Sequence, residues 1–144
     1  MNSNGSNQVP AARPTAGLVE YTHWIYALHS LSVLTALVTS THIAGRFLFG
    51  LPSLIAVIMN YARRSEAHGG YLASHFVWQI RTFWYALLSL AITLLISAPL
   101  ILVLGVGILT AMAGFSVIGV WVSYRIVRGW LALRAGATMP VKFV

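Results

Sequence analysis

The sequence lacks cysteine and aspartate altogether, and its only acidic residues are Glu20 and Glu66. Without Cys there is no disulfide, no thiolate nucleophile and no Cys ligand for zinc or an iron–sulfur cluster. Two distant Glu residues do not provide the carboxylate pair that acid–base or two-metal chemistry uses. The chain also shows no P-loop, GxSxG or HExxH motif. We therefore expect no enzyme activity.

Charge of either sign is scarce as well. Only 8% of the 144 residues are charged and 58% are hydrophobic, and the mean hydropathy is +0.81. A soluble domain carries about 25% charged residues, which keep its surface hydrated. The composition therefore indicates an integral membrane protein.

Uncharged stretches predict where helices cross the membrane. Residues 21–45 exceed the roughly 20 residues that a crossing helix needs. Residues 82–124 carry no charge and are long enough for two crossings. We place these at about 82–102 and 106–127, with Pro99 and the glycines that follow it marking the turn.

The segment 47–62 is shorter than the other three. At 1.5 Å per residue it reaches about 24 Å, against about 30 Å for the hydrocarbon core. It spans if its flanking residues Arg46 and Arg63 extend to the interfaces. A re-entrant or interfacial helix is the alternative, and it would leave three spans.

Aromatic residues decide between these two topologies. The positive-inside rule puts residues 63–81 and the C-terminus in the cytoplasm either way. Four spans place every Trp and Tyr towards the cytoplasmic interface, whereas three spans leave Tyr21, Trp24 and Tyr26 on the far side. We therefore predict an all-α, polytopic membrane helix bundle. It has four transmembrane helices, the second one short, and both termini are cytoplasmic.

The domain organisation is simple. Residues 1–17 are polar, lack a signal-peptide pattern, and are expected to form a disordered tail. The four-helix transmembrane domain covers residues 18–135. Residues 136–144 follow as a short C-terminal tail.

Small and polar residues form a stripe along helix 82–102, at spacings of three and four. Such a stripe lets a neighbouring backbone approach closely and hydrogen-bond across the interface. Gly107, Ala111 and Gly114 repeat the pattern on helix 106–127. Helix packing is our main interpretation, and a substrate path is the alternative. The stripe consists of Thr82, Ala86, Ser89, Thr93 and Ser97.

Four polar side chains fall in the cytoplasmic half of the predicted bundle, namely His29, Asn60, His75 and Gln79. Each is costly in hydrocarbon unless it is paired. We expect them to form a mainly structural polar cluster with His75 and Gln79 at its centre. A haem held by two histidines would need a second His at the depth of His29, and neither helix 82–102 nor its neighbours offers one. We therefore predict no haem, metal or other cofactor.

The net charge of +7 arises from nine basic residues against two glutamates, and several of the arginines lie near aromatic residues. In so apolar a chain, we interpret them as anchors for anionic lipid headgroups and not as a nucleic-acid surface. The predicted headgroup residues are Arg63, Arg64, Arg81, Arg125 and Arg128.

The order of motifs resembles a known family. Pro52 opens the second helix and Asn60-Tyr61 closes it, a basic loop follows, and His75-Phe76 with Gln79 leads into the third helix. Over about residues 20–140, this order resembles small four-helix bacterial membrane proteins of unknown function. Those proteins are distantly similar to the Tic-twenty subunit of the chloroplast import machinery. The resemblance implies a helical, multi-pass component of the bacterial inner membrane with no established enzyme activity.

Two functions are consistent with this sequence. The first is a noncatalytic accessory or assembly subunit of a larger membrane complex, which would contact lipids and other subunits. The second is an oligomeric small transporter or pore, with the Ser/Thr stripe lining the path. An ion path usually shows buried charges, and helix 82–102 offers only hydroxyls, which favours the first.

Overall fold

A computed structural model describes residues 13–38, 43–103 and 105–140. Over these residues the protein is all-helical, with four helices and no strand, so the predicted all-α class and the number of helices are confirmed. The helices are α1 (Ala16–Val38), α2 (Ile43–Ala62), α3 (Leu72–Leu100) and α4 (Val106–Arg134).

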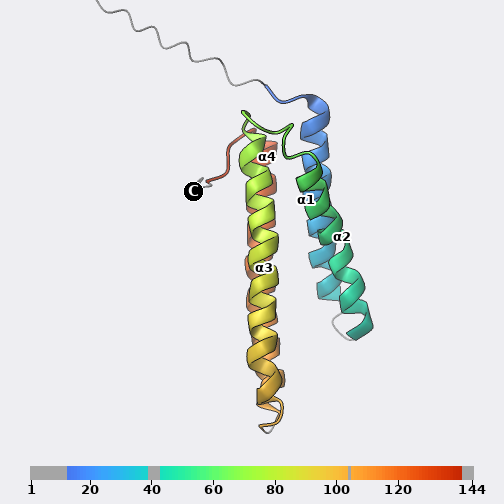
Figure 1. The fold of residues 1–144 in the computed structure, drawn as a ribbon, viewed down its shortest axis with the longest axis vertical. Coiled ribbons are helices and arrows are strands. Elements are labelled where there is room, and N and C mark those ends of the chain that lie inside the picture. Colours follow the sequence, from blue (N-terminus) through green and yellow to red (C-terminus); the bar gives the residue numbers. More distant parts are fainter. Residues whose placement is uncertain (1–12, 39–42, 104, 141–144) are drawn as a thin grey trace, which may run out of the picture.

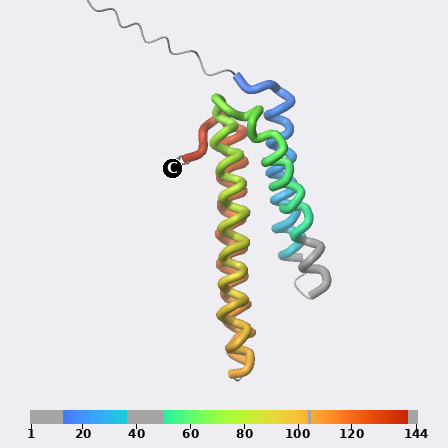
Figure 2. Tube along the Cα trace, in the orientation of Figure 1, coloured from blue at the N-terminus to red at the C-terminus, as the bar shows by residue number. Residues whose placement is uncertain are grey.

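The helices form two hairpins, in which α1 packs along α2 and α3 packs along α4 (Figure 1). Helices α3 and α4 have 29 residues each, which makes them about 43 Å long. The α1–α2 hairpin is shorter, and the long hairpin extends well past it (Figure 2). Helices α1 and α3 begin at one end of the molecule, and α2 and α4 finish there. We call this end the shared end.

The hydrophobic core lies at the shared end. Its fully buried members include Ile25 and Tyr26 of α1 and Leu72 and Phe76 of α3. In the distal segment of the long hairpin, residues 87–120, only Ser97 and Gly107 are buried among the described residues. The molecule thus has a packed core at one end and an apolar, uncovered hairpin at the other.

Small residues hold α3 against α4 in that distal segment. A Cβ added at Gly107 would collide with the backbone carbonyl of Ser97, and one added at Gly114 would collide with Thr93. The Thr110 hydroxyl donates a hydrogen bond of 3.1 Å to the Ser97 hydroxyl. The stripe residues are buried or half-buried here, while their neighbours on α3 are mostly exposed. The stripe therefore faces α4 of the same chain.

The turn between α3 and α4 follows Pro99, the last residue but one of α3. Gly105, which precedes α4, adopts a left-handed conformation with φ of 71°. Left-handed φ values favour glycine because it has no Cβ. The backbone here therefore needs the glycine that the sequence provides.

Several helix boundaries differ from the predicted ones. Helix α2 begins at Ile43, so that Pro52 lies inside it and not at its start, and helix α4 continues beyond residue 127 to Arg134. Helix α3 begins at Leu72 and not near Thr82, because residues 72–81 pack into the core at the shared end. Helix α1 begins at Ala16, after Thr15, whose hydroxyl accepts a hydrogen bond from the Leu18 N–H. Two residues of the predicted tail are thus helical. The rest of that tail up to residue 12, and residues 141–144, lie outside the described residues.

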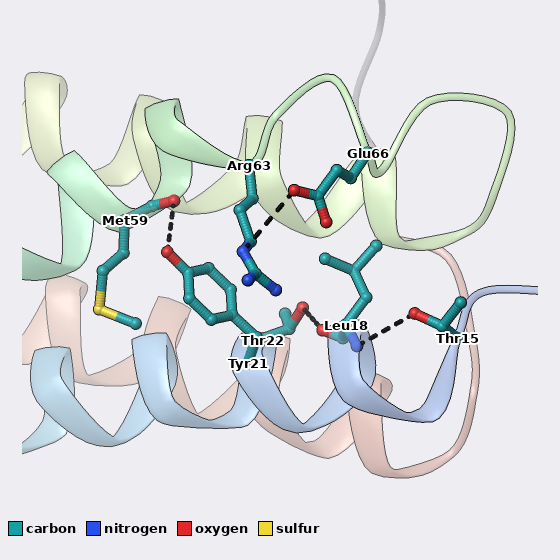
Figure 3. A network of polar contacts seen from close by, with 7 residues as sticks. All are labelled: Thr15, Leu18, Tyr21, Thr22, Met59, Arg63 and Glu66. Carbon is teal, nitrogen blue, oxygen red and sulfur yellow. Dashed lines mark hydrogen bonds and ion pairs between the residues drawn. The ribbon is translucent and has the colours of Figure 1, made fainter.

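Polar contacts fasten α1 to α2 at the shared end (Figure 3). The Tyr21 hydroxyl donates to the Met59 carbonyl at 3.1 Å. The Arg63 guanidinium lies over the Tyr21 ring at 4.6 Å and pairs with Glu66 at 3.7 Å. An exposed ion pair contributes less than about 1 kcal/mol, so packing and the buried hydrogen bonds do most to hold this hairpin together.

Two of the four helices, α3 and α4, are long and apolar enough to cross a membrane. Residues Gly50–Ala62 of α2 form a shorter apolar helix. The described structure thus supports two membrane crossings by length and composition.

The close α3–α4 contact predicts opposite effects for two glycines of α4. Gly107→Ala should lower the unfolding free energy by about 1–3 kcal/mol, because the new Cβ meets backbone that cannot move aside cheaply. Gly119→Ala has open space around the added Cβ. It should be neutral or stabilising by up to about 1 kcal/mol, through helix propensity. Unfolding by SDS titration in mild detergent measures both, and equal effects would argue against the packing described.

Candidate functional site

His75 is the most connected of the predicted site residues. It is completely buried. Its Nδ1 lies 3.0 Å from the Tyr26 hydroxyl, and its Nε2 lies 2.8 Å from the Ala137 carbonyl oxygen. A carbonyl oxygen only accepts, so Nε2 carries the proton and Nδ1 accepts from Tyr26. The histidine therefore joins α1, α3 and the segment after α4.

The segment after α4 turns back over the start of α3 (Figure 1). Besides the Ala137 carbonyl, the Met139 N–H donates to the Ser74 hydroxyl at 2.9 Å, and the Met139 side chain is buried. Gly136 allows this reversal with φ of 64°. Residues expected to be a plain tail thus complete the core at the shared end.

Tyr26 reaches His75 because α4 presents a glycine beside it. A Cβ at Gly129 would collide with the Tyr26 ring and hydroxyl. The Tyr26 ring also stacks on Trp130, with 6.4 Å between centroids and 10° between planes. The Trp130 indole N–H in turn donates to His23 Nδ1 at 2.9 Å. An aromatic layer thus covers the hydrogen bond between Tyr26 and His75.

His29 lies one turn after Tyr26 on α1, and only one of its ring nitrogens has a partner. Its Nδ1 is 3.1 Å from the Ser53 hydroxyl of α2. The Ser53 N–H donates to the Ser32 hydroxyl at 2.9 Å, which fixes α2 in place beside α1. The Nε2 atom of His29 is buried without a hydrogen-bond partner.

Gln79 and Asn60 are also incompletely bonded. Gln79 is 2% exposed; its amide lies near the Tyr26 hydroxyl, but neither its Oε1 nor its Nε2 makes a hydrogen bond of regular geometry. The Asn60 Nδ2 donates to the Ala56 carbonyl of its own helix at 3.3 Å, while its Oδ1 has none. The structure thus places the four predicted polar residues in the interior, but their hydrogen bonds run to other groups and not to one another.

Arg125 of α4 is held on α3 by three contacts. Its Nε donates to the Thr82 hydroxyl at 2.7 Å. Its guanidinium carbon lies 3.5 Å from the centroid of the Trp78 ring, a cation–π arrangement. The Trp78 indole N–H donates to the Arg125 carbonyl at 3.1 Å. Arg125 is therefore half-buried and ordered by the protein.

Three of the other four predicted headgroup arginines are exposed. Arg63 contacts Tyr21 and Glu66, Arg64 is exposed, and Arg81 is half-buried. Arg128 is exposed and donates to the Tyr124 hydroxyl at 3.1 Å. Among these five arginines, only Arg125 lines the cavity between the two hairpins.

That cavity lies between the two hairpins and has a volume of about 250 Å³. Its polar lining residues are His29, Gln79 and Arg125, together with Tyr26, Ser53 and Thr82, which hydrogen-bond within the protein. Apolar side chains of the long hairpin line the remainder, among them Phe83, Leu87, Leu90, Ile118 and Val122. A mostly apolar pocket with a few convergent polar groups is the usual form of a small-molecule site.

Reasoning from the sequence missed Tyr26, Thr82 as a partner of Arg125, and the Ala137 carbonyl. Tyr26 was counted as an interfacial aromatic, which is how most Tyr residues near a membrane behave. The glycine at 129, which follows the arginines of α4, is the one local signal that a bulky side chain from another helix lies there.

Within the part of the chain that the structure describes, no three His, Cys, Asp or Glu side chains gather into a group that could hold a metal ion. No family model, curated protein or solved structure matches this chain.

The hydrogen bond between Tyr26 and His75 predicts a stability effect. Tyr26→Phe leaves the buried Nδ1 of His75 without a donor, which should cost about 1–3 kcal/mol of unfolding free energy. Tyr61→Phe is the matched control, because the exposed Tyr61 hydroxyl accepts only from Trp84 at the surface. Its effect should stay within about 0.5 kcal/mol. Similar losses in both variants, measured by SDS titration, would contradict the role given to Tyr26.

Proposed function

We propose that the chain is a multi-pass protein of the bacterial inner membrane and a noncatalytic accessory or assembly subunit of a larger membrane complex. The exposed apolar surface of the long hairpin is the observation that carries this proposal. Leu102 is 90% exposed, Leu95 76% and Val120 73%. A soluble protein rarely leaves such a continuous apolar surface in water.

The distribution of charge supports a cytoplasmic shared end. The distal segment carries no charged side chain, whereas Arg63 and Arg64 lie in the loop before α3 and Arg128 lies near the end of α4. Basic residues concentrate on the cytoplasmic side of membrane proteins. Both termini would then be cytoplasmic, and the α3–α4 turn would face the other side.

The short hairpin also suits a bilayer. Leu34 of α1 and Leu54 and Ile58 of α2 are exposed. Helix α2 has 20 residues, a length of about 30 Å that matches the hydrocarbon core. These features support four crossings, with α2 as a full span and not a re-entrant helix.

The position of the stripe favours a subunit over a pore. Thr93 and Ser97 contact α4 of the same chain, at Gly114 and Thr110. Hydroxyls used in this way are not available to line a path between copies of the chain. The uncovered outer faces of the long hairpin are instead apolar, as a surface that meets lipid or partner helices would be.

The natural absence of cysteine makes the topology directly testable. Single-cysteine variants Ser65→Cys, in the loop before α3, and Leu102→Cys, in the α3–α4 turn, each carry the only thiol. A membrane-impermeant maleimide should label Leu102→Cys from the periplasm, and Ser65→Cys only after the inner membrane is opened. The unmodified chain is the blank.

A reporter fused before Met1 completes this experiment and should read cytoplasmic. A periplasmic reading, with Ser65→Cys still cytoplasmic, would replace four spans by three. Labelling of both cysteines from one side would overturn the membrane-spanning hairpin itself.

The subunit role predicts a stoichiometric partner. Purification in mild detergent through a C-terminal tag, followed by mass spectrometry, should recover another membrane polypeptide in about equal amount. A photo-crosslinking residue at Leu95, on the exposed outer face of α3, should attach to that same polypeptide. Recovery of the chain without another polypeptide would contradict the subunit role. Recovery as a self-oligomer would in addition favour the transporter alternative.

A further inference from the structure

We propose that the cavity between the two hairpins is a binding site for an anionic amphiphile, a lipid whose oxyanion head is a carboxylate or a phosphate. Arg125, Gln79 and His29 would bind the head, and the apolar wall of the long hairpin would bind the start of the chain. The supply of such a ligand rests on the membrane location proposed above. The site itself is tested on purified protein, so the two proposals fail separately.

Two of the three polar residues, His29 and Gln79, lie at nearly the same level of the bundle. Helices α1 and α3 both begin at the shared end and run in the same direction, with Tyr26 bonded to His75. His29 lies about 4.5 Å further along α1, and Gln79 about 6 Å further along α3. Both therefore lie one turn beyond that bond, where the cavity begins.

The buried polar side chains that precede and follow Gln79 on α3 are hydrogen-bonded, whereas the Gln79 amide makes no hydrogen bond of regular geometry. One turn before it His75 has two partners, and three residues after it Thr82 accepts from Arg125. A buried amide without partners costs about 1–3 kcal/mol. Such a group, in the wall of a cavity, offers hydrogen-bond donors and an acceptor to a bound ligand.

The charge of Arg125 indicates the sign of the ligand. The only ion pair in the described part of the chain joins Arg63 and Glu66, so no carboxylate neutralises Arg125 there. A water molecule in the cavity would satisfy the amide and the imidazole, but it would leave this half-buried cation uncompensated. An oxyanion accepts from the guanidinium, from the Gln79 amide N–H and from His29 Nε2–H, the last when the Ser53 hydroxyl donates to Nδ1.

The size and lining of the cavity indicate the rest of the ligand. At about 250 Å³ it exceeds the roughly 150 Å³ cavity that takes benzene in another protein. It has room for a small head and the first carbons of a chain. Leu87, Leu90 and Ile118 continue the lining along the exposed side of the long hairpin. The remaining chain would follow this apolar side into the bilayer.

Delipidated protein in an uncharged detergent tests the site with three probes: oleate, dioleoylphosphatidylglycerol and the uncharged dioleoylglycerol. Native mass spectrometry and thermal unfolding report binding. We expect at least one anionic probe to bind one per chain and to raise the Tm, and dioleoylglycerol to do neither. Binding of oleate alone assigns a fatty-acid site, and binding of dioleoylphosphatidylglycerol assigns a phospholipid site.

Two variants locate the binding. Gln79→Leu removes an amide that has no partner, so without a probe it should unfold at the wild-type Tm or above, yet bind the anionic probe about tenfold more weakly. Arg125→Gln should weaken binding at least as much. Arg128→Gln is the matched control, because this exposed arginine lies outside the cavity, and it should bind as the wild type does.

Three results would overturn the site. Equal binding of dioleoylglycerol would show that charge is not recognised. Equal losses in Arg125→Gln and Arg128→Gln would show headgroup contact at the surface. Wild-type affinity in a folded Gln79→Leu protein would show that the cavity is not where the head binds.

Discussion

A buried hydrogen bond between Tyr26 of α1 and His75 of α3 ties the two hairpins together, and much of the shared end depends on it. The bond requires Gly129, because a side chain there would occupy the space of the Tyr26 ring. It also orients the imidazole so that Nε2 donates to the Ala137 carbonyl and holds the C-terminal segment in place. One histidine thus organises three parts of the chain that are far apart in sequence. In a low-dielectric interior each bond of such a series polarises the next, so the series acts as a unit.

The distal segment obeys a different constraint. It has almost no buried apolar side chains, so burial of apolar surface cannot hold α3 to α4 there. Gly107 and Gly114 instead allow the backbones to approach, and Thr110 hydrogen-bonds to Ser97 across the interface. Van der Waals contact between small residues and a few hydroxyl bonds is how helices associate in lipid, where no hydrophobic effect acts between them. The same hairpin in water would have little reason to hold its shape.

Much of this fold could be predicted because its signals are local. The all-helical class follows from long uncharged stretches, and the α3–α4 turn follows from Pro99 and Gly105. The uncharged stretch predicts the start of α3 ten residues late, because Arg81 interrupts it. Tertiary contacts, and not composition, bury His75 and Gln79 in the helical turns before that arginine. The pairing of Arg125 with Thr82 depends on the register of two antiparallel helices, and the Ala137 carbonyl carries no sequence signal at all. These features could only come from the structure.

The contrast between His75 and Gln79 shows what the polar interior does. Both lie on one face of α3 and both are buried, so the sequence gives them equal standing as structural groups. His75 is fully bonded and its contribution is to stability. Gln79 makes no hydrogen bond of regular geometry, and with His29 Nε2 it leaves hydrogen-bonding capacity beside Arg125, which no carboxylate of the described residues neutralises. A protein selected only for stability would place a leucine at this position, because that removes an unbonded amide and extends the apolar wall. The glutamine is therefore best explained by something that it binds.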